Sequence, residues 1–127
     1  MSTEKLMIRD WVLHDGEPYQ IRQLGIYGVN RDGEDYPAVC VGKPKGIGLI
    51  IERNEISPIP LTDEILEQNG FERVNGEYQD VFYVYDGIEL LIDNGYTLFG
   101  QCKMPIKYVH ELQHVLRLCG INKEIEI

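Results

Sequence analysis

The sequence of 127 residues has no long apolar run and is short of basic side chains. No stretch reaches the ~20 apolar residues that a membrane-spanning helix requires. The N-terminal residues lack the basic and then apolar pattern of a signal peptide. Twelve Lys and Arg against 21 Asp and Glu give a net charge of -9, which repels phosphate backbones and anionic lipid. We therefore expect a cytoplasmic protein that binds neither nucleic acid nor a membrane.

Cysteine is also scarce. Cys40, Cys102 and Cys119 are odd in number and widely spaced, which disfavours a disulfide framework and a four-cysteine zinc site. No neighbouring base marks any of them as a nucleophile. We expect Cys102 and Cys119 to pack as small apolar groups in a reducing compartment.

The chain divides in pattern at residues 57–60, Ser-Pro-Ile-Pro, where two prolines force extended backbone. Residues 1–60 carry 7 basic and 9 acidic side chains, and residues 61–127 carry 5 and 12. We predict a small β lobe over 1–60 and an α-β-β-β-β-α lobe over 61–127, in two lobes or one compact domain. The fold class is α+β.

The first lobe contains about five short β-branched segments separated by turn residues, with almost no helical period. This pattern predicts a small SH3-like β-barrel or, as the alternative, a curled open sheet.

The second lobe begins with a short helix, predicted over residues 63–69. Thr62 is suited to cap its N-terminus, and Asn69 with Gly70 provides a left-handed stop. Three hairpin dipeptides follow, and they predict a four-stranded antiparallel meander with tight turns. A last helix over residues 105–119 is expected to pack on this meander, and residues 121–127 to form an edge strand. The three dipeptides are Asn75-Gly76, Asp86-Gly87 and Asn94-Gly95.

Residues 110–114 match the H-E-x-x-H motif of zinc peptidases. In that motif His110 and His114 would hold zinc, and Glu111 would act as general base on metal-bound water. On a helical wheel, however, both histidines fall opposite the apolar arc, and a third ligand is missing nearby. We therefore predict a solvated helix face without a metal and keep the zinc site as the alternative. The predicted buried residues are Val109, Leu112 and Leu116, and the predicted outward residues are His110, Gln113, His114 and Arg117.

Two further features bear on binding. The glycine-rich segment 42–48 contains Lys43 and Lys45 but lacks the end of a phosphate loop, so it favours a hairpin loop over a phosphate cradle. Tyr83 and Tyr85 alternate with Phe82 and Val84 along one strand, and only one face of that strand can lie under the last helix. The other face is an aromatic binding surface or is covered by the first lobe.

Three motifs carry a resemblance: residues 59–66 (IPLTDEIL), 69–71 (NGF) and 106–114 (IKYVHELQH). Together they resemble a group of small uncharacterised proteins from Bacteroides-type bacteria and their phages and prophages, over residues 58–121. In that group Gln and Asn often stand at the positions of Glu111 and His114, which weighs against zinc. The resemblance implies no activity, and it implies a phage or mobile-element context in a bacterial cytoplasm.

Three functions follow as hypotheses. The first is a non-enzymatic intracellular protein that binds a protein partner, such as a host factor or a defence-related protein. The second is a minimal zinc hydrolase that uses Glu111 with His110 and His114. The third is a small-ligand or nucleotide-binding sponge with a pocket between the two lobes, where Lys43, Lys45 and the tyrosines would hold an anion and a base.

Overall fold

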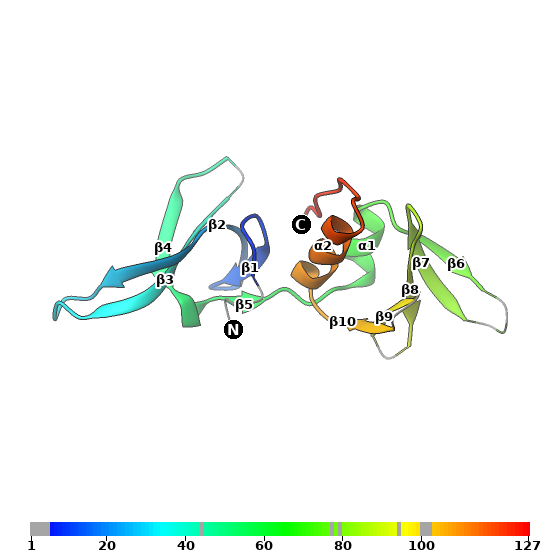
Figure 1. Cartoon of the computed structure of the whole chain (residues 1–127), viewed down its shortest axis with the longest axis horizontal. Coiled ribbons are helices and arrows are strands. Elements are labelled where there is room, and N and C mark those ends of the chain that lie inside the picture. The colour runs from blue at the N-terminus through cyan, green and yellow to red at the C-terminus, as the bar shows by residue number, and fades with distance from the viewer. Residues whose placement is uncertain (1–5, 44, 77, 79, 94, 100–102) are drawn as a thin grey trace. The chain divides into compact units, whose positions relative to one another are not determined.

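A computed structural model describes residues 6–43, 45–76, 78, 80–93, 95–99 and 103–127. The chain forms two compact units, Met1–Ile59 and Pro60–Ile127, each built around an antiparallel sheet (Figure 1). Both α-helices of the described residues lie in the second unit, so the fold is α+β. Neither of these helices has the length and apolar character needed to cross a membrane.

The first unit holds a five-stranded sheet in the order β4-β3-β2-β1-β5, with antiparallel neighbours throughout. This sheet is not closed, so the closed SH3-like barrel is not confirmed. A 3-10 turn, η2 (Arg53–Glu55), joins the last two strands. The strands are β1 (Trp11–His14), β2 (Glu17–Val29), β3 (Asp35–Gly42), β4 (Gly48–Glu52) and β5 (Ser57–Pro58).

Strand β2 is much longer than the apolar pattern predicts. It continues through Gly25, which has a φ of +70°, and its register against β3 shifts on both sides of Gln23. These irregularities bend β2, so that its first half packs on the core and its second half forms a two-stranded extension with β3. The core beneath the sheet consists of Leu6, Val12, Ile21, Val39, Val41 and Ile56.

The second unit also holds a five-stranded antiparallel meander, in the order β10-β9-β8-β7-β6. The prediction of four strands is wrong, because residues 104–106 pair with β9 instead of starting the last helix. Pro105 is tolerated there because β10 is an edge strand. The elements are α1 (Asp63–Gln68), β6 (Glu72–Asn75), β7 (Val81–Tyr85), β8 (Ile88–Ile92), β9 (Tyr96–Phe99), β10 (Met104–Ile106) and α2 (Val109–Leu118).

The ends of α1 are as predicted. The hydroxyl of Thr62 accepts a hydrogen bond from the Ile65 amide, and Gly70 follows the helix with a φ of +86°. The Phe71 amide then donates to the carbonyl of Leu66, which completes a Schellman turn.

The hairpin predictions have three different outcomes. Asp86 and Gly87 both have positive φ and form the expected tight turn between β7 and β8. Asn75 and Gly76 do not form one: β7 begins only at Val81, and the Gly76 amide donates to the carbonyl of Asp80 across a longer loop. The third turn includes Asn94, which lies outside the described residues.

Polar contacts join α1 to one face of the second sheet. The hydroxyl of Tyr96 donates to the carboxylate of Asp63, and the hydroxyl of Tyr83 donates to that of Glu67 over 3.4 Å. Because Asp63 and Glu67 are four residues apart, they share one face of the helix. The two phenols therefore hold α1 on the face of the sheet that carries Tyr83.

Helix α2 is covered over more of its surface than predicted. Val109, Leu112 and Leu116 are buried as expected, but His110 is only 5% exposed and Gln113 only 2%. His114 is half-buried, as is Arg117. The prediction that all four polar residues face outward is therefore wrong, since it assumed that a single side of the helix would be covered.

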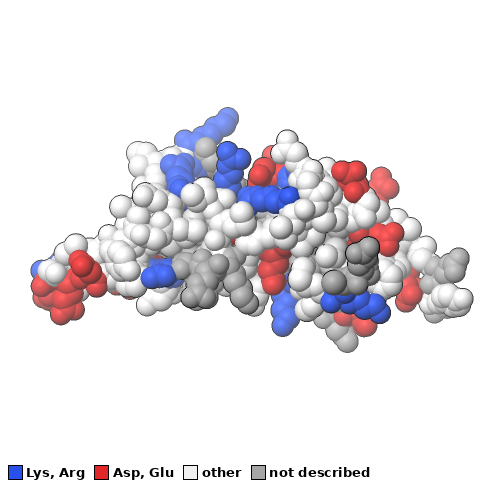
Figure 2. Space-filling model, in the orientation of Figure 1, with Lys and Arg blue, Asp and Glu red and all other residues white. Residues whose placement is uncertain are grey.

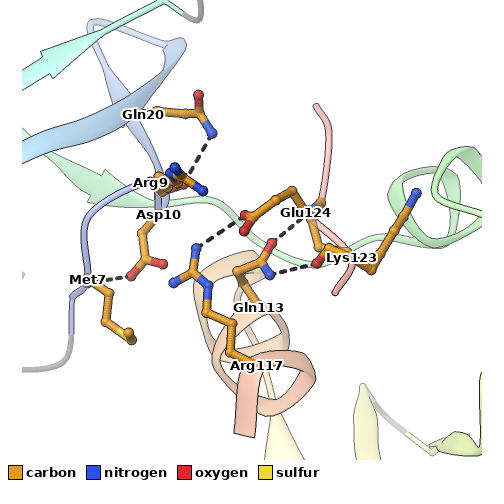
Figure 3. Close-up of polar contacts among 9 residues, drawn as sticks. Met7, Arg9, Asp10, Gln20, Gln113, Arg117, Lys123 and Glu124 are labelled. Atoms are coloured by element: carbon orange, nitrogen blue, oxygen red, sulfur yellow. Dashed lines mark hydrogen bonds and ion pairs between the residues drawn. The ribbon is translucent and has the colours of Figure 1, made fainter. Parts of the chain in front are cut away.

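The segment after α2 accounts for the burial of Gln113. Gln113 donates to the carbonyl of Lys123 over 2.8 Å and accepts from the Ile125 amide over 2.7 Å (Figure 3). Asn69 makes the same pair of contacts with the backbone of Glu126. Residues 121–127 therefore form no strand, because two side-chain amides satisfy their backbone instead of a sheet edge.

Replacing Gln113 tests this role. Gln113→Ala should lower the free energy of unfolding by about 1–3 kcal/mol, because it leaves buried backbone groups of the tail without these bonds. Hydrogen exchange of the Ile125 amide should accelerate in parallel. Gln113→Glu is the matched control, since it keeps an acceptor for Ile125 and loses the donor for Lys123. Unchanged protection of Ile125 in Gln113→Ala would contradict this assignment.

The tyrosine contacts predict an alkaline limit to stability. Burial, the hydrogen bond to Asp63 and its charge raise the pKa of Tyr96 above the usual 10.0. Above pH ~10 the unfolded chain loses this proton and the folded chain keeps it, so the free energy of unfolding should fall as pH rises. Urea denaturation from pH 8 to 11 should show this fall. Tyr96→Phe should make it shallower, and Tyr78→Phe, at a 92% exposed position, should not. An equally steep fall in Tyr96→Phe would refute the prediction.

Candidate interaction face

The glutamate of the H-E-x-x-H motif is used at the start of α2. The Glu111 carboxylate accepts hydrogen bonds from the amides of Lys107 and Tyr108, over 2.9 and 3.0 Å. These amides stand at the helix N-terminus, where they have no partner within the helix. Glu111 is thus a capping residue, as in a capping box, and its carboxylate points back along the chain instead of toward a metal-bound water.

The two histidines of the motif are close but incomplete as a metal site. The rings of His110 and His114 are 5.7 Å apart, and the ring of His110 stacks on Tyr108 at 5.8 Å. Among the described residues, no group of three or more His, Cys, Asp or Glu side chains is arranged to hold a metal ion. The geometry therefore gives the zinc alternative no support.

The glycine-rich segment is a hairpin turn between β3 and β4. The guanidinium of Arg22 donates to the carbonyls of Lys43 and Gly46, each over 2.6 Å, and so closes this turn. The ammonium of Lys43 lies 4.3 Å from the ring centre of Tyr19 and donates to the carbonyl of Pro18. Lys43 thus has contacts inside the first unit, while Lys45 is exposed.

Tyr83 and Tyr85, the two tyrosines named as binding candidates, lie on β7 of the second unit. Tyr83 is fully buried, so it is wrong as a binding-surface residue. Tyr85 is half-buried and its ring stacks on Phe71 at 5.1 Å. Both belong to the face of β7 that packs under α1, because a strand alternates its side chains between two faces.

The opposite face of the second sheet is exposed and largely apolar. Cross-strand pairs place Phe82 and Val84 on this face, away from the buried Tyr83. Phe82 and Phe99 make an edge-to-face ring pair at 5.9 Å, and the ammonium of Lys103 lies 5.4 Å from the ring centre of Phe99. We define the outer face as Glu72, Val74, Phe82, Val84, Glu89, Leu91, Thr97, Phe99 and Pro105.

Each side chain of the outer face is half-buried or exposed. Val74 and Phe99 are both more than 40% exposed. The two helices lie on the other side of this sheet in Figure 1. Its two carboxylates, from Glu72 and Glu89, flank Val84 across the strands. The register gives the outer face an uncharged row and a neighbouring row that alternates acidic and apolar side chains. The first row is Val74, Phe82, Leu91 and Thr97, and the second is Glu72, Val84, Glu89 and Phe99. Exposed apolar patches beside polar residues are a feature of protein-binding surfaces.

The second unit also has a hollow of about 260 Å³, lined in part by Leu61, Tyr96, Ile106 and Lys107. This volume is below the range of typical small-molecule sites. The hollow therefore adds little to the small-ligand hypothesis.

The two described cysteines lie outside the outer face. Cys40 is half-buried and Cys119 is exposed, so the prediction that Cys119 packs as a small apolar group is wrong. Cys102 lies outside the described residues.

The sequence analysis missed Val74, Leu91 and Phe99. One signal could have found Leu91: a two-residue turn at Asp86-Gly87 pairs Tyr85 with Ile88, and counting back pairs Phe82 with Leu91. Residue spacing alone does not give the register of β6 against β7, because the loop between these strands is longer than predicted.

The role of Glu111 can be measured. Glu111→Ala should lower the free energy of unfolding by about 0.5–2 kcal/mol, as the loss of a helix cap does. Glu111→Gln should retain most of the stability, because its amide oxygen still accepts. Elemental analysis of the same proteins, purified without added metal, should find less than one zinc per chain. The capping role would be contradicted if Glu111→Ala were as stable as the wild type. It would also be contradicted if the wild type held one zinc per chain and His110→Ala lost it.

Comparison with known proteins adds no relative: no family model, curated protein or solved structure matches this chain.

Proposed function

We propose that the protein is a non-enzymatic binding protein and that the outer face of its second sheet is its contact surface for a protein partner. The observation that carries this proposal is the apolar cluster of Val74, Phe82, Leu91 and Phe99. Phe82 pairs across the strands with Val74 and Leu91, and its ring contacts the ring of Phe99. Residues that anchor protein interfaces are commonly aromatic and aliphatic side chains in such clusters.

Charge indicates what kind of partner fits. Glu72 and Glu89 add two negative charges to the outer face, and residues 61–127 carry 12 acidic against 5 basic side chains. Figure 2 shows Asp and Glu side chains spread over the visible surface of the second unit. A partner segment with an apolar stripe and flanking Lys or Arg residues would complement this surface and be steered toward it.

The cellular setting is part of the proposal. The resemblance of residues 58–121 to small proteins of Bacteroides-type bacteria and their phages favours a mobile-element protein that acts in the host cytoplasm. A host factor or a defence-related protein would then supply the basic, apolar segment. The zinc hydrolase receives no comparable support, since the Glu111 carboxylate caps the start of α2. The nucleotide sponge, with its pocket between the lobes, remains an alternative hypothesis.

Affinity capture followed by direct titration tests the function. Tagged protein would be incubated with lysate of a Bacteroides-type bacterium, and a retained protein would be purified and titrated against each variant. Phe99→Asp should weaken the affinity at least about tenfold, because it places a charge in the apolar cluster. Glu89→Lys should weaken it less and should reduce its dependence on salt.

Leu118→Asp provides the matched control. Leu118 is 86% exposed at the end of α2 and lies outside the sheet, so this variant should bind like the wild type. A partner whose affinity is unchanged by Phe99→Asp and by Glu89→Lys would place binding elsewhere on the chain.

A further inference from the structure

Strand β4 is an edge of the first sheet without the usual protection of an edge. It pairs with β3 on one side, and no other strand of the described residues pairs with its second side. Its register with β3 runs without a bulge, and residues 46–51 contain neither charge nor proline. Such an edge presents unpaired backbone groups and readily accepts another strand.

The side chains of this edge are apolar and exposed. Ile50 is 61% exposed, Leu49 is 45% exposed, and Ile47, just before the strand, is 90% exposed. The strand therefore exposes aliphatic side chains to water, and a second strand with aliphatic side chains would cover them.

One face of this edge also carries a fixed positive charge. The register places Gly48, Ile50 and Glu52 on one face, opposite Gly42, Cys40 and Ala38 of β3. Arg22 crosses this face: a Cβ on Gly42 would lie 2.5 Å from the guanidinium carbon, and a Cβ on Gly48 would lie 3.6 Å from Nη1. The two glycines leave room for the guanidinium, which the turn carbonyls hold in place.

We propose that β4 pairs with β4 of a second copy of this chain, antiparallel and about a two-fold axis at Ile50. In this register all five residues of β4 pair with β4 of the second copy, because Ile50 is the middle residue of the strand. Ile50 then opposes its own counterpart, and Leu49 opposes Ile51 of the second copy. The two sheets become one sheet of ten strands, joined by an isologous contact.

The charges agree with this register. Glu52 of each copy stands directly opposite Gly48 of the other, on the face that Arg22 crosses. Its carboxylate then lies next to the guanidinium of Arg22 of the other copy, and the two-fold axis repeats this ion pair. An axis at Leu49 would instead place Glu52 opposite Gly46, beyond the strand, and Lys45 opposite Arg53. Charge complementarity thus selects Ile50 as the centre.

Sedimentation velocity over a range of protein concentrations tests the proposal. The wild type should show a reversible monomer–dimer equilibrium that weakens with added salt. Ile50→Lys should raise the dissociation constant at least about tenfold, because it places like charges directly opposite each other. Glu52→Gln should raise it roughly two- to fivefold and make it less sensitive to salt.

Val29→Lys is the matched control, since Val29 is 64% exposed on β2 and lies outside the edge. It should dimerise like the wild type, as should Phe99→Asp on the second unit. Circular dichroism would establish that Ile50→Lys remains folded. A wild type that is monomeric at every concentration would overturn the proposal and leave β4 as a docking strand for an unrelated peptide. A dimer that Ile50→Lys does not weaken would also overturn it.

Discussion

The pairing of β7 with β8 determines most of what the second unit presents to its surroundings. The positive φ values of Asp86 and Gly87 make a two-residue turn, which pairs Tyr85 with Ile88. A slip of one residue would exchange the two faces of the strand, because side chains alternate with a period of two. Tyr83 would then lose its place under α1, and Phe82 would leave the outer face. The contact of Tyr83 with α1 and the place of Phe82 on the outer face therefore depend on one turn.

Side-chain amides perform in this protein a task that backbone pairing performs elsewhere. Gln113 and Asn69 each donate to and accept from the backbone of the C-terminal segment. An amide can do both, since it carries a donor and an acceptor on one planar group. The segment can thus lie over buried surface without forming a strand. This arrangement also buries a face of α2 that a simple amphipathic helix would expose.

A catalytic motif in a sequence can have a purely structural use. The spacing of His110, Glu111 and His114 is that of zinc peptidases, yet Glu111 accepts hydrogen bonds from two amides at the helix start. A glutamate at the third helical position is a common capping residue, so capping accounts for the glutamate of the motif. The glycine-rich loop also has a structural role, since Gly42 and Gly48 leave room for the guanidinium of Arg22, which donates to the carbonyls of Lys43 and Gly46.

Local chemistry in the sequence was sufficient for features that depend on neighbouring residues. Thr62, Asn69 and Gly70 define α1, and Asp86 with Gly87 defines a turn, because caps and tight turns are set by the conformations of a few adjacent residues. The alternation of β-branched residues likewise indicated strands and an α+β fold. Only the tertiary structure decided that residues 104–106 extend the sheet and that His110 and Gln113 are buried. It also decided which face of β7 stays exposed and that β4 forms an open edge. These outcomes depend on pairing and covering by segments distant in sequence, which no local pattern records.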